Sequence, residues 1–243
     1  MIADRNAEAV SAYERGDHAL AAGLLRPLAQ QGSPPAQRNL GVLYETGRGV
    51  RQDYDEAVKW YRRAASRGYA EAQTNLAAMY QDGNGVPQDA QEAVKWYRKA
   101  ADQGDSRAQF DLSQMHRKAR GIPQDYQEAL KWYRKAAEQA HASAQHKLGV
   151  MYAKGLGVTQ DYHEAAKWYR QAAVQGEAKA QNNLGQLYEL GQGVPQDFVQ
   201  AYMWYSVAAR GLTGDRRNTA TKNRDEVASR MTPAQIQEAQ DMA

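Results

Sequence analysis

The sequence of 243 residues contains no cysteine, only two phenylalanines and no long apolar run. Without cysteine the chain cannot form a disulfide, a zinc–thiolate site, an iron–sulfur cluster or a thiol nucleophile. No stretch approaches the ~20 apolar residues of a membrane-spanning helix. An excess of one charge is also lacking, because 31 Lys and Arg stand against 28 Asp and Glu, for a formal net charge of +3. So small a charge does not favour nucleic acid as the partner.

The first residues also lack the features of a signal peptide. Met1-Ile2-Ala3-Asp4 has neither a basic segment nor the apolar segment that follows one in secretory signals. Two interpretations fit: a cytoplasmic protein, or a mature periplasmic or secreted chain from which a signal peptide has been removed. The sequence leaves both open.

What the chain does have is a repeat of 36 residues. A Trp-Tyr pair, an Ala-Ala pair, a leucine, a loop glycine and an aspartate each recur five times in one register. Such self-similarity is typical of repeat proteins, in which each unit packs against its neighbours. The tryptophans that mark the register are Trp60, Trp96, Trp132, Trp168 and Trp204.

One unit is predicted to consist of two helices. Over residues 34–47 the apolar side chains recur with helical spacing around Leu40, and a Gly-x-Gly-Val loop follows. Asp53 is a suitable N-cap for a second helix over about 54–67, and Glu56 stands where it would complete a capping box. No segment shows the alternation of a strand. We therefore expect an all-α protein, a right-handed α-solenoid of stacked helix-turn-helix repeats.

The period also predicts the domain organisation. Regions without the repeat pattern flank the array at both ends, as expected of caps that protect a solenoid from solvent. The predicted parts are an N-terminal tetratricopeptide-like capping helix pair (1–32), five repeats within 33–211 (33–68, 69–104, 105–140, 141–176 and 177–211) and C-terminal capping helices (212–243).

The unit AxAQxNLGxxYxxGxGVxxDxxEAxxWYxxAAxxG resembles the Sel1-like repeat, a bacterial relative of the tetratricopeptide repeat. The resemblance implies a non-enzymatic scaffold or adaptor for protein–protein interactions, with a protein or peptide partner and no cofactor. A monomer is expected because the terminal segments are polar. The partner itself cannot be inferred from such a general module.

The resemblance also suggests where a partner would bind. If the first helix of each unit lines a concave groove, as in tetratricopeptide arrays, the positions near the repeated leucine face that groove. The residues at these positions differ from one unit to the next. Recurring asparagines precede that leucine, and we consider two roles: clamping a partner's backbone, or a hydrogen bond to a neighbouring loop that fixes the spacing of the repeats. The candidate partner-binding residues are Arg38, Asn39, Thr74, Asn75, Phe110, Gln114, Arg117, His146, Asn182, Asn183 and Gln186.

No catalytic or metal-binding constellation is found in the sequence. The five histidines form neither HExxH nor a pair four residues apart, and no GxSxG nucleophile motif occurs. The Gly-x-Gly pairs follow helices instead of strands, so a turn explains them better than a phosphate loop. The repeated aspartates are better explained as N-caps than as catalytic acids.

Two alternative functions remain open. The second helices carry a stripe of Lys and Arg residues beside the repeated Trp-Tyr pairs, which we call the Trp-Tyr ladder. The first interpretation is that the charges form salt bridges on a solvated face and that the rings pack between repeats. The second is that the charges bind nucleic acid and that exposed rings stack on its bases. The second alternative is a hydrolase-type or β-lactam-binding protein of the cell envelope, because cysteine-rich Sel1-like proteins have been linked to β-lactams; this chain lacks their cysteine pairs. The stripe consists of Lys59, Arg62, Lys95, Arg98, Lys131, Arg134, Lys167 and Arg170.

Overall fold

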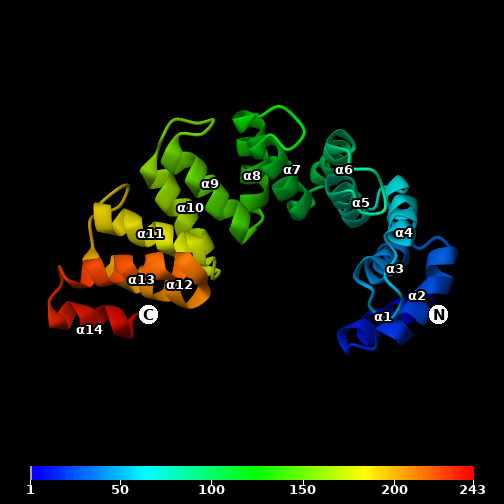
Figure 1. Cartoon of the computed structure of the whole chain (residues 1–243), viewed down its shortest axis with the longest axis horizontal. Coiled ribbons are helices and arrows are strands. Elements are labelled where there is room, and N and C mark those ends of the chain that lie inside the picture. The colour runs from blue at the N-terminus through cyan, green and yellow to red at the C-terminus, as the bar shows by residue number, and fades with distance from the viewer. Residues whose placement is uncertain (1) are drawn as a thin grey trace. The chain divides into compact units, whose positions relative to one another are not determined.

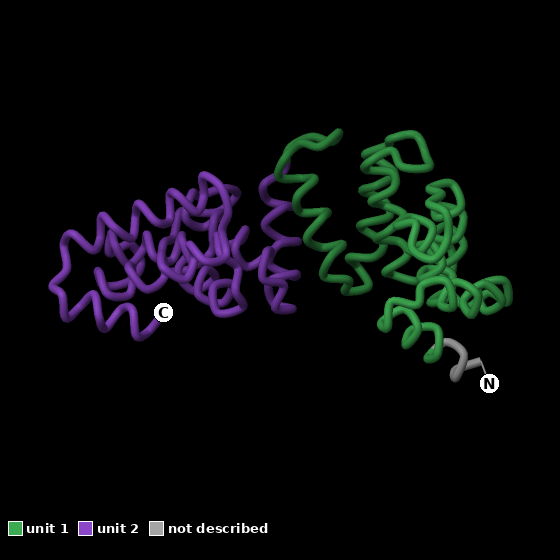
Figure 2. Tube along the Cα trace, turned by 60° about the horizontal axis from the view of Figure 1, so that its bottom comes forward, with its two compact units in different colours: residues 1–124 green, residues 125–243 purple. Residues whose placement is uncertain are grey.

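The computed structural model describes the backbone of residues 2–243 and the side chains from residue 7 onward. Within that part the chain forms fourteen α-helices and no strand, which confirms the all-α prediction. Met1, at the start of the predicted N-terminal cap, lies outside the described residues. The chain divides into two compact units, residues 1–124 and 125–243, shown in green and purple in Figure 2. The boundary falls inside the third repeat.

Unit 1 holds seven helices, and each packs against the next along the chain (Figure 1). The repeats begin with the third helix, so odd numbers mark first helices and even numbers second helices. The helices are α1 (Ile2–Glu14), α2 (His18–Gln30), α3 (Pro34–Thr46), α4 (Tyr54–Ser66), α5 (Ala70–Asp82), α6 (Ala90–Asp102) and α7 (Ser106–Lys118).

Unit 2 repeats this arrangement and ends with two helices outside the period. Consecutive helices pack together as far as α13, and α14 packs against α12. The described part of the chain includes no helix that is both long and apolar enough to span a membrane. The helices are α8 (Tyr126–Glu138), α9 (Ala142–Lys154), α10 (Tyr162–Val174), α11 (Ala178–Leu190), α12 (Phe198–Gly211), α13 (Gly214–Ala228) and α14 (Pro233–Asp241).

The second helices begin at the predicted aspartate N-caps. The Asp53 carboxylate accepts a hydrogen bond from the backbone N–H of Glu56 at 3.0 Å, and Asp89, Asp125, Asp161 and Asp197 cap their helices in the same way. The capping-box part of the prediction is wrong, because the Glu56 carboxylate binds Lys59 Nζ at 2.6 Å instead. An acid in the first turn is still favourable beside the positive end of the helix dipole.

The two glycines of each Gly-x-Gly loop have different tasks. Gly47 ends α3 in the left-handed conformation, with φ of 67°, which costs glycine little. Gly49 (φ 69°) lies against the start of α2, where a Cβ would come within 2.2 Å of the His18 carbonyl. The first glycine therefore ends a helix, and the second lets the loop close on the preceding helix pair. This confirms the turn interpretation.

Small residues and aromatic rings make up the packed interior. Tyr61 is fully buried, and a Cβ on Gly41 of the facing helix would lie 2.6 Å from its ring. Trp60, Trp132 and Trp168 are buried, so packing is confirmed as the role of these three rings of the Trp-Tyr ladder. Trp96 and Trp204 are half-buried.

A buried glutamine in each first helix closes the preceding helix, a role that the sequence analysis did not assign. The Gln73 side chain donates to the Ala65 carbonyl at 3.1 Å, eight residues earlier. The Ala65 carbonyl also accepts from the Gly68 backbone N–H at 3.0 Å, so the glutamine is a second donor to a carbonyl in the last turn of the helix. The signal was present in the sequence, as a polar residue repeated at a buried register position. The set is Gln37, Gln73, Gln109, Gln145 and Gln181.

Candidate functional site

All predicted partner-binding residues lie on first helices, and we call their positions the first-helix face. The two units each carry part of it. In unit 1 it comprises Arg38 and Asn39 on α3, Thr74 and Asn75 on α5, and Phe110, Gln114 and Arg117 on α7; in unit 2 it comprises His146 on α9 and Asn182, Asn183 and Gln186 on α11.

In unit 1 the asparagines tie neighbouring side chains together. Arg38 Nη1 donates to Asn39 Oδ1 at 2.9 Å, and Arg107 of α7 donates to Asn75 Oδ1 of α5 at 3.5 Å. Thr74 and Asn75 are only 2% and 6% exposed. These two residues therefore lie beneath the surface, where they order the residues around them.

Tyr61 of α4 extends this polar cluster. Its hydroxyl donates to the Glu45 carboxylate at the end of α3. Burial raises the pKa of Tyr61, and the Glu45 charge adds to the effect, whereas the Arg38 charge and a hydrogen bond with Asn75 oppose it. Tyr205 and Glu189 repeat the bond in unit 2, at 2.8 Å.

The α7 part of the face departs from the other repeats. Asp111 stands where Asn39 and Asn75 stand in the first two units, and its Oδ2 lies 3.8 Å from Arg107 Nε. Burial raises the pKa of the Asp111 carboxyl to about 6, although the positive charge of Arg107 works against the shift. One turn further along, Arg117 Nη2 lies 3.5 Å from Gln114 Oε1.

In unit 2 the face is centred on a buried histidine. His146 is 5% exposed, its Nε2 lies 3.3 Å from Asn183 Nδ2, and its ring centroid lies 5.9 Å from that of Tyr169. Burial lowers the His146 pKa to about 4, so the imidazole is neutral at pH 7. Next to this pair, Asn182 Oδ1 is buried without a hydrogen-bond partner in the described part of the chain, and Gln186 is exposed.

These contacts bear on the two roles considered for the recurring asparagines. Asn75 and Asn183 each bond a side chain of another first helix of their own unit. The contacts join consecutive repeats, as the spacing role requires, although the partners are Arg107 and His146 instead of a loop. To clamp a partner's backbone, these asparagines would have to use the donor and acceptor positions of their amide groups that the contacts with Arg107 and His146 do not occupy.

The Lys/Arg stripe of the second helices is engaged in contacts within the protein. Lys59, Lys95, Lys131 and Lys167 lie 2.6, 2.6, 3.1 and 3.4 Å from the glutamate one turn earlier. Three of its arginines donate to the tyrosine hydroxyl of the next first helix, in the pairs Arg62–Tyr80, Arg134–Tyr152 and Arg170–Tyr188. Exposed ion pairs contribute at most ~1 kcal/mol each, so these pairs add little to stability but partly neutralise the positive charge of the stripe.

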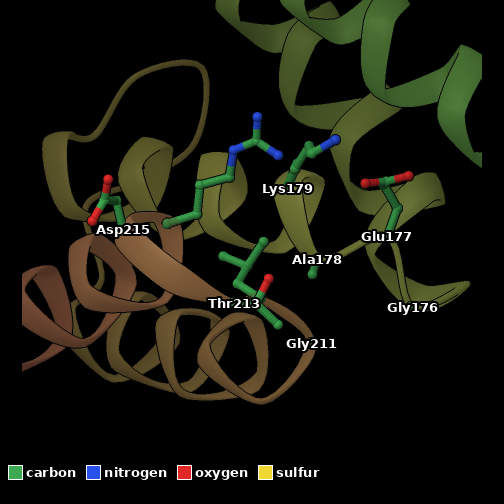
Figure 3. Close-up of a pocket in the computed structure, with 9 residues that line it drawn as sticks. Gly176, Glu177, Ala178, Lys179, Gly211, Thr213 and Asp215 are labelled. Carbon is green, nitrogen blue, oxygen red and sulfur yellow. The ribbon is translucent and has the colours of Figure 1, made fainter.

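A recess of about 550 Å³ lies where α11 and α13 begin, at the end of α12. Figure 3 shows Lys179 and Glu177 at the start of α11 and Asp215 at the start of α13, on either side of Thr213. Arg216 completes a balanced set of two cations and two anions. Thr213 is the only hydroxyl among the described lining residues, and no histidine or buried acid faces it. The recess therefore does not offer a paired nucleophile and base.

Within the described residues no group of three or more His, Asp or Glu side chains is placed to hold an ion. His163 and His141 lie apart, bonded to the Gly193 carbonyl at 3.3 Å and the Ala144 backbone N–H at 3.2 Å.

The family model described as "Sel1 repeat" matches the chain five times in succession, at residues 34–69, 70–105, 106–141, 142–177 and 178–211. The chain belongs to the Sel1 repeat family. Its fold is similar to that of a solved Sel1 repeat protein from Oxalobacter formigenes, with 34% identity, a TM-score of 0.83 and 97% of each chain covered.

A Sel1 repeat protein from Klebsiella pneumoniae shares the fold at 20% identity and a TM-score of 0.53, over 85% of this chain and 99% of that one. No match was found among curated proteins. The Sel1 repeat neighbours are bacterial and indicate a bacterial origin. Sel1 repeats typically serve as scaffolds for protein–protein interactions and are generally not enzymes.

Proposed function

We propose that this Sel1 repeat protein is a non-enzymatic, monomeric scaffold whose first-helix face binds an extended peptide or a helix of a partner protein. One observation supports the proposal above the others. The polar residues that recur in register are mostly engaged within the fold, whereas the first-helix face carries side chains that differ from one unit to the next.

The division between the two sets is clear in the contacts. Repeated aspartates cap helices, repeated glutamines close them, and repeated lysines pair with glutamates. On the varied face, hydrogen-bonding capacity remains. Arg38 Nε and Asn182 Oδ1 are buried atoms without a hydrogen-bond partner among the described residues. Since an unmade bond at a buried polar atom costs about 1–3 kcal/mol, a peptide backbone would gain affinity there when these two side chains turn outward to meet it.

Phe110 adds an apolar anchor to the polar part of the face in unit 1. It is half-buried on α7, one turn before Gln114. Aromatic anchors surrounded by polar groups dominate the energetics of many interfaces. The mixture suits an extended peptide or an amphipathic helix, both of which combine backbone or polar contacts with a few apolar side chains.

The proposal can be tested by selecting peptides from a random library displayed on phage and measuring their binding by fluorescence polarisation. We expect selected peptides to lose at least ten-fold in affinity for Phe110→Ala/Gln114→Ala or for Asn182→Ala/Gln186→Ala. These variants spare the buried Thr74, Asn75 and His146. The matched control, Lys59→Ala/Lys95→Ala, changes exposed residues of second helices and should bind as the wild type does.

A library that yields no binder, or binders that respond to the lysine control and not to the face variants, would contradict the proposal. Circular dichroism should show that every variant is fully folded at the temperature of the binding measurement. Turnover of a β-lactam such as nitrocefin that a point substitution abolishes would establish the envelope-enzyme alternative instead.

A further inference from the structure

The fourth repeat carries a recess on its second helix, and none of the residues that line it belongs to the first-helix face. The recess has a volume of about 500 Å³ and lies between α10 and the loop that follows α11, both in unit 2. Its size is within the ~300–1,000 Å³ of ordinary ligand sites. It is lined by His163, Ala166, Lys167, Arg170, Gln171, Val174, Gly193 and Val194.

Comparison of the repeats explains why the recess is apolar here. Ala166, in its floor, occupies a position held by a larger apolar residue in every other repeat. A missing side chain at this register leaves apolar surface without cover. The equivalent residues of the other repeats are Val58, Val94, Leu130 and Tyr202.

Val174, at the end of α10, adds exposed apolar surface at the edge. It is 71% exposed, more than any other large apolar residue described as exposed. The equivalent positions hold Ser66, Asp102, Glu138 and Arg210, all polar. A singly exposed valine is ordinary, but Val174 lines the same recess as Ala166, where the larger side chain of the other repeats is missing. Both substitutions therefore add apolar surface to one recess.

A third departure lies in the lining of the recess itself. In the first three repeats a cation one turn after the tryptophan lies over its ring, as Arg63 does at 4.6 Å from the Trp60 centroid. In the fourth repeat this cation is replaced by Gln171, whose amide oxygen accepts from Gln145 at 3.3 Å.

The charges around the recess determine what it can accept. Lys167 and Arg170 border it, His163 lies beside them, and none of the lining residues is acidic. Lys167 has the longest of the four equivalent ion pairs, 3.4 Å to Glu164. An occupant that fits therefore carries an aliphatic group for the floor and a carboxylate for the rim.

We propose that this recess is a second docking site, which takes one aliphatic side chain of an acidic segment of a partner protein. The side chain covers Ala166, Val174 and Val194, and a neighbouring carboxylate of the segment lies near Lys167 and Arg170. A partner seated here would leave the first-helix face unoccupied, so the scaffold could hold two partners at once.

The test is calorimetric titration of the full chain with a short Gly/Ser peptide that carries one leucine flanked by glutamates. We expect one site in the wild type. Leucine and tyrosine occur at the position of Ala166 in other repeats, so Ala166→Leu should fold normally while filling the floor. It should weaken binding about 10- to 100-fold, the effect of one buried leucine side chain. Replacing the peptide leucine by serine should have the same effect.

A second variant tests whether the same three changes create a binding site in another repeat. Leu130→Ala/Lys135→Gln/Glu138→Val copies the three departures onto α8, which packs against α9 in the same unit. The triple variant should bind two peptides where the wild type binds one. Replacing the glutamates of the peptide by glutamine should weaken binding and remove its salt dependence.

No binding of the peptide by the wild type would overturn the proposal, as would unchanged binding to Ala166→Leu. Equal affinity for the leucine and serine peptides would show attraction by charge alone and would also overturn it. The face variants Phe110→Ala/Gln114→Ala should bind this peptide normally, so the result is independent of the function proposed for the first-helix face.

Discussion

Asn183 Nδ2 lies 3.3 Å from Nε2 of the buried His146 and so links α11 to α9. The contact joins the first helices of two consecutive repeats. Since burial favours the neutral imidazole, whose pKa falls to about 4, the proton state of one side chain is coupled to how these helices pack.

The stability of unit 2 should therefore depend on pH through His146. Its pKa is lower in the folded than in the unfolded chain, where it is about 6.5. Between these values the unfolded chain binds the extra proton, so stability is lost as pH falls from 6.5 to 4. The loss is on the order of 3 kcal/mol. Urea unfolding across this pH range should show the slope in the wild type and a smaller one in His146→Gln; equal slopes would contradict the assignment.

Asp111 in unit 1 should show the opposite dependence. Its folded pKa of about 6 lies above the ordinary value of 3.8, so the folded chain holds the proton more tightly. The resulting stability is full below pH 3.8 and is lost as pH rises through 6. Asp111→Asn, which restores the residue of the first two repeats, should stabilise the protein by about 1–3 kcal/mol at pH 7. The gain should shrink towards zero at pH 4, and a gain that is constant with pH would refute the explanation.

The second glycine of each loop should be harder to replace than a glycine of similar backbone conformation elsewhere. Gly193 and Gly176 both have positive φ, of 67° and 86°. A Cβ at Gly193 would lie 2.2 Å from the Tyr162 carbonyl, whereas nothing lies within 4 Å of one at Gly176. Both alanine variants should lose about 1–2 kcal/mol for the left-handed conformation. Gly193→Ala should lose about 1–3 kcal/mol more through the clash.

Chemical unfolding of the two glycine variants measures that difference directly. If Gly176→Ala proved as destabilising as Gly193→Ala, close approach between the loop and α10 would not be the reason for the repeated glycine.

The buried glutamines should contribute more to stability than the exposed loop glutamines. Gln181 donates to the buried Ala173 carbonyl at 3.0 Å, and Gln196 donates to the Glu189 carbonyl at 2.8 Å near the surface. The Ala173 carbonyl keeps the Gly176 N–H at 3.0 Å, but Gln181→Ala removes its second donor and leaves a cavity where a buried side chain stood, so it should cost about 1–3 kcal/mol. Gln196→Ala should cost under about 1 kcal/mol because water replaces the lost donor. Differential scanning calorimetry of both variants checks the order.

Much of the fold could be predicted because the same physical requirement recurs in each repeat. One aspartate at a helix start is a weak signal, but five in register identify an N-cap, and the structure confirms it from Asp53 to Asp197. The capping box failed because Glu56 had a second favourable partner, Lys59, one turn along its own helix. The repeat pattern shows which residues recur, but it does not show which of two nearby groups a recurring side chain will bind.

The candidate site was harder to predict. Helical spacing places Thr74 and His146 on the first-helix face, but it does not reveal that both are buried. Burial depends on neighbouring repeats, such as the Tyr169 ring beside His146. The buried glutamines were missed for a related reason, since the partner of Gln73 is a backbone carbonyl on another helix. The recess at Ala166 becomes visible only when its lining is compared with the sequence of the other repeats.

The contacts between repeats have one further consequence, for how such chains change in length. In unit 1, Gln73 closes on Ala65, Arg62 reaches Tyr80, and Gly85 lies against Tyr54. Each of these contacts joins a repeat to the one before it through positions that recur every 36 residues. Unequal recombination between two equivalent codons would therefore insert or delete a whole module and rebuild the glutamine and glycine contacts at the new junction; the Arg–Tyr pair would also be rebuilt, except where the third repeat has His116 in place of the tyrosine. Gene duplication could therefore lengthen the array without requiring a new kind of interface between repeats.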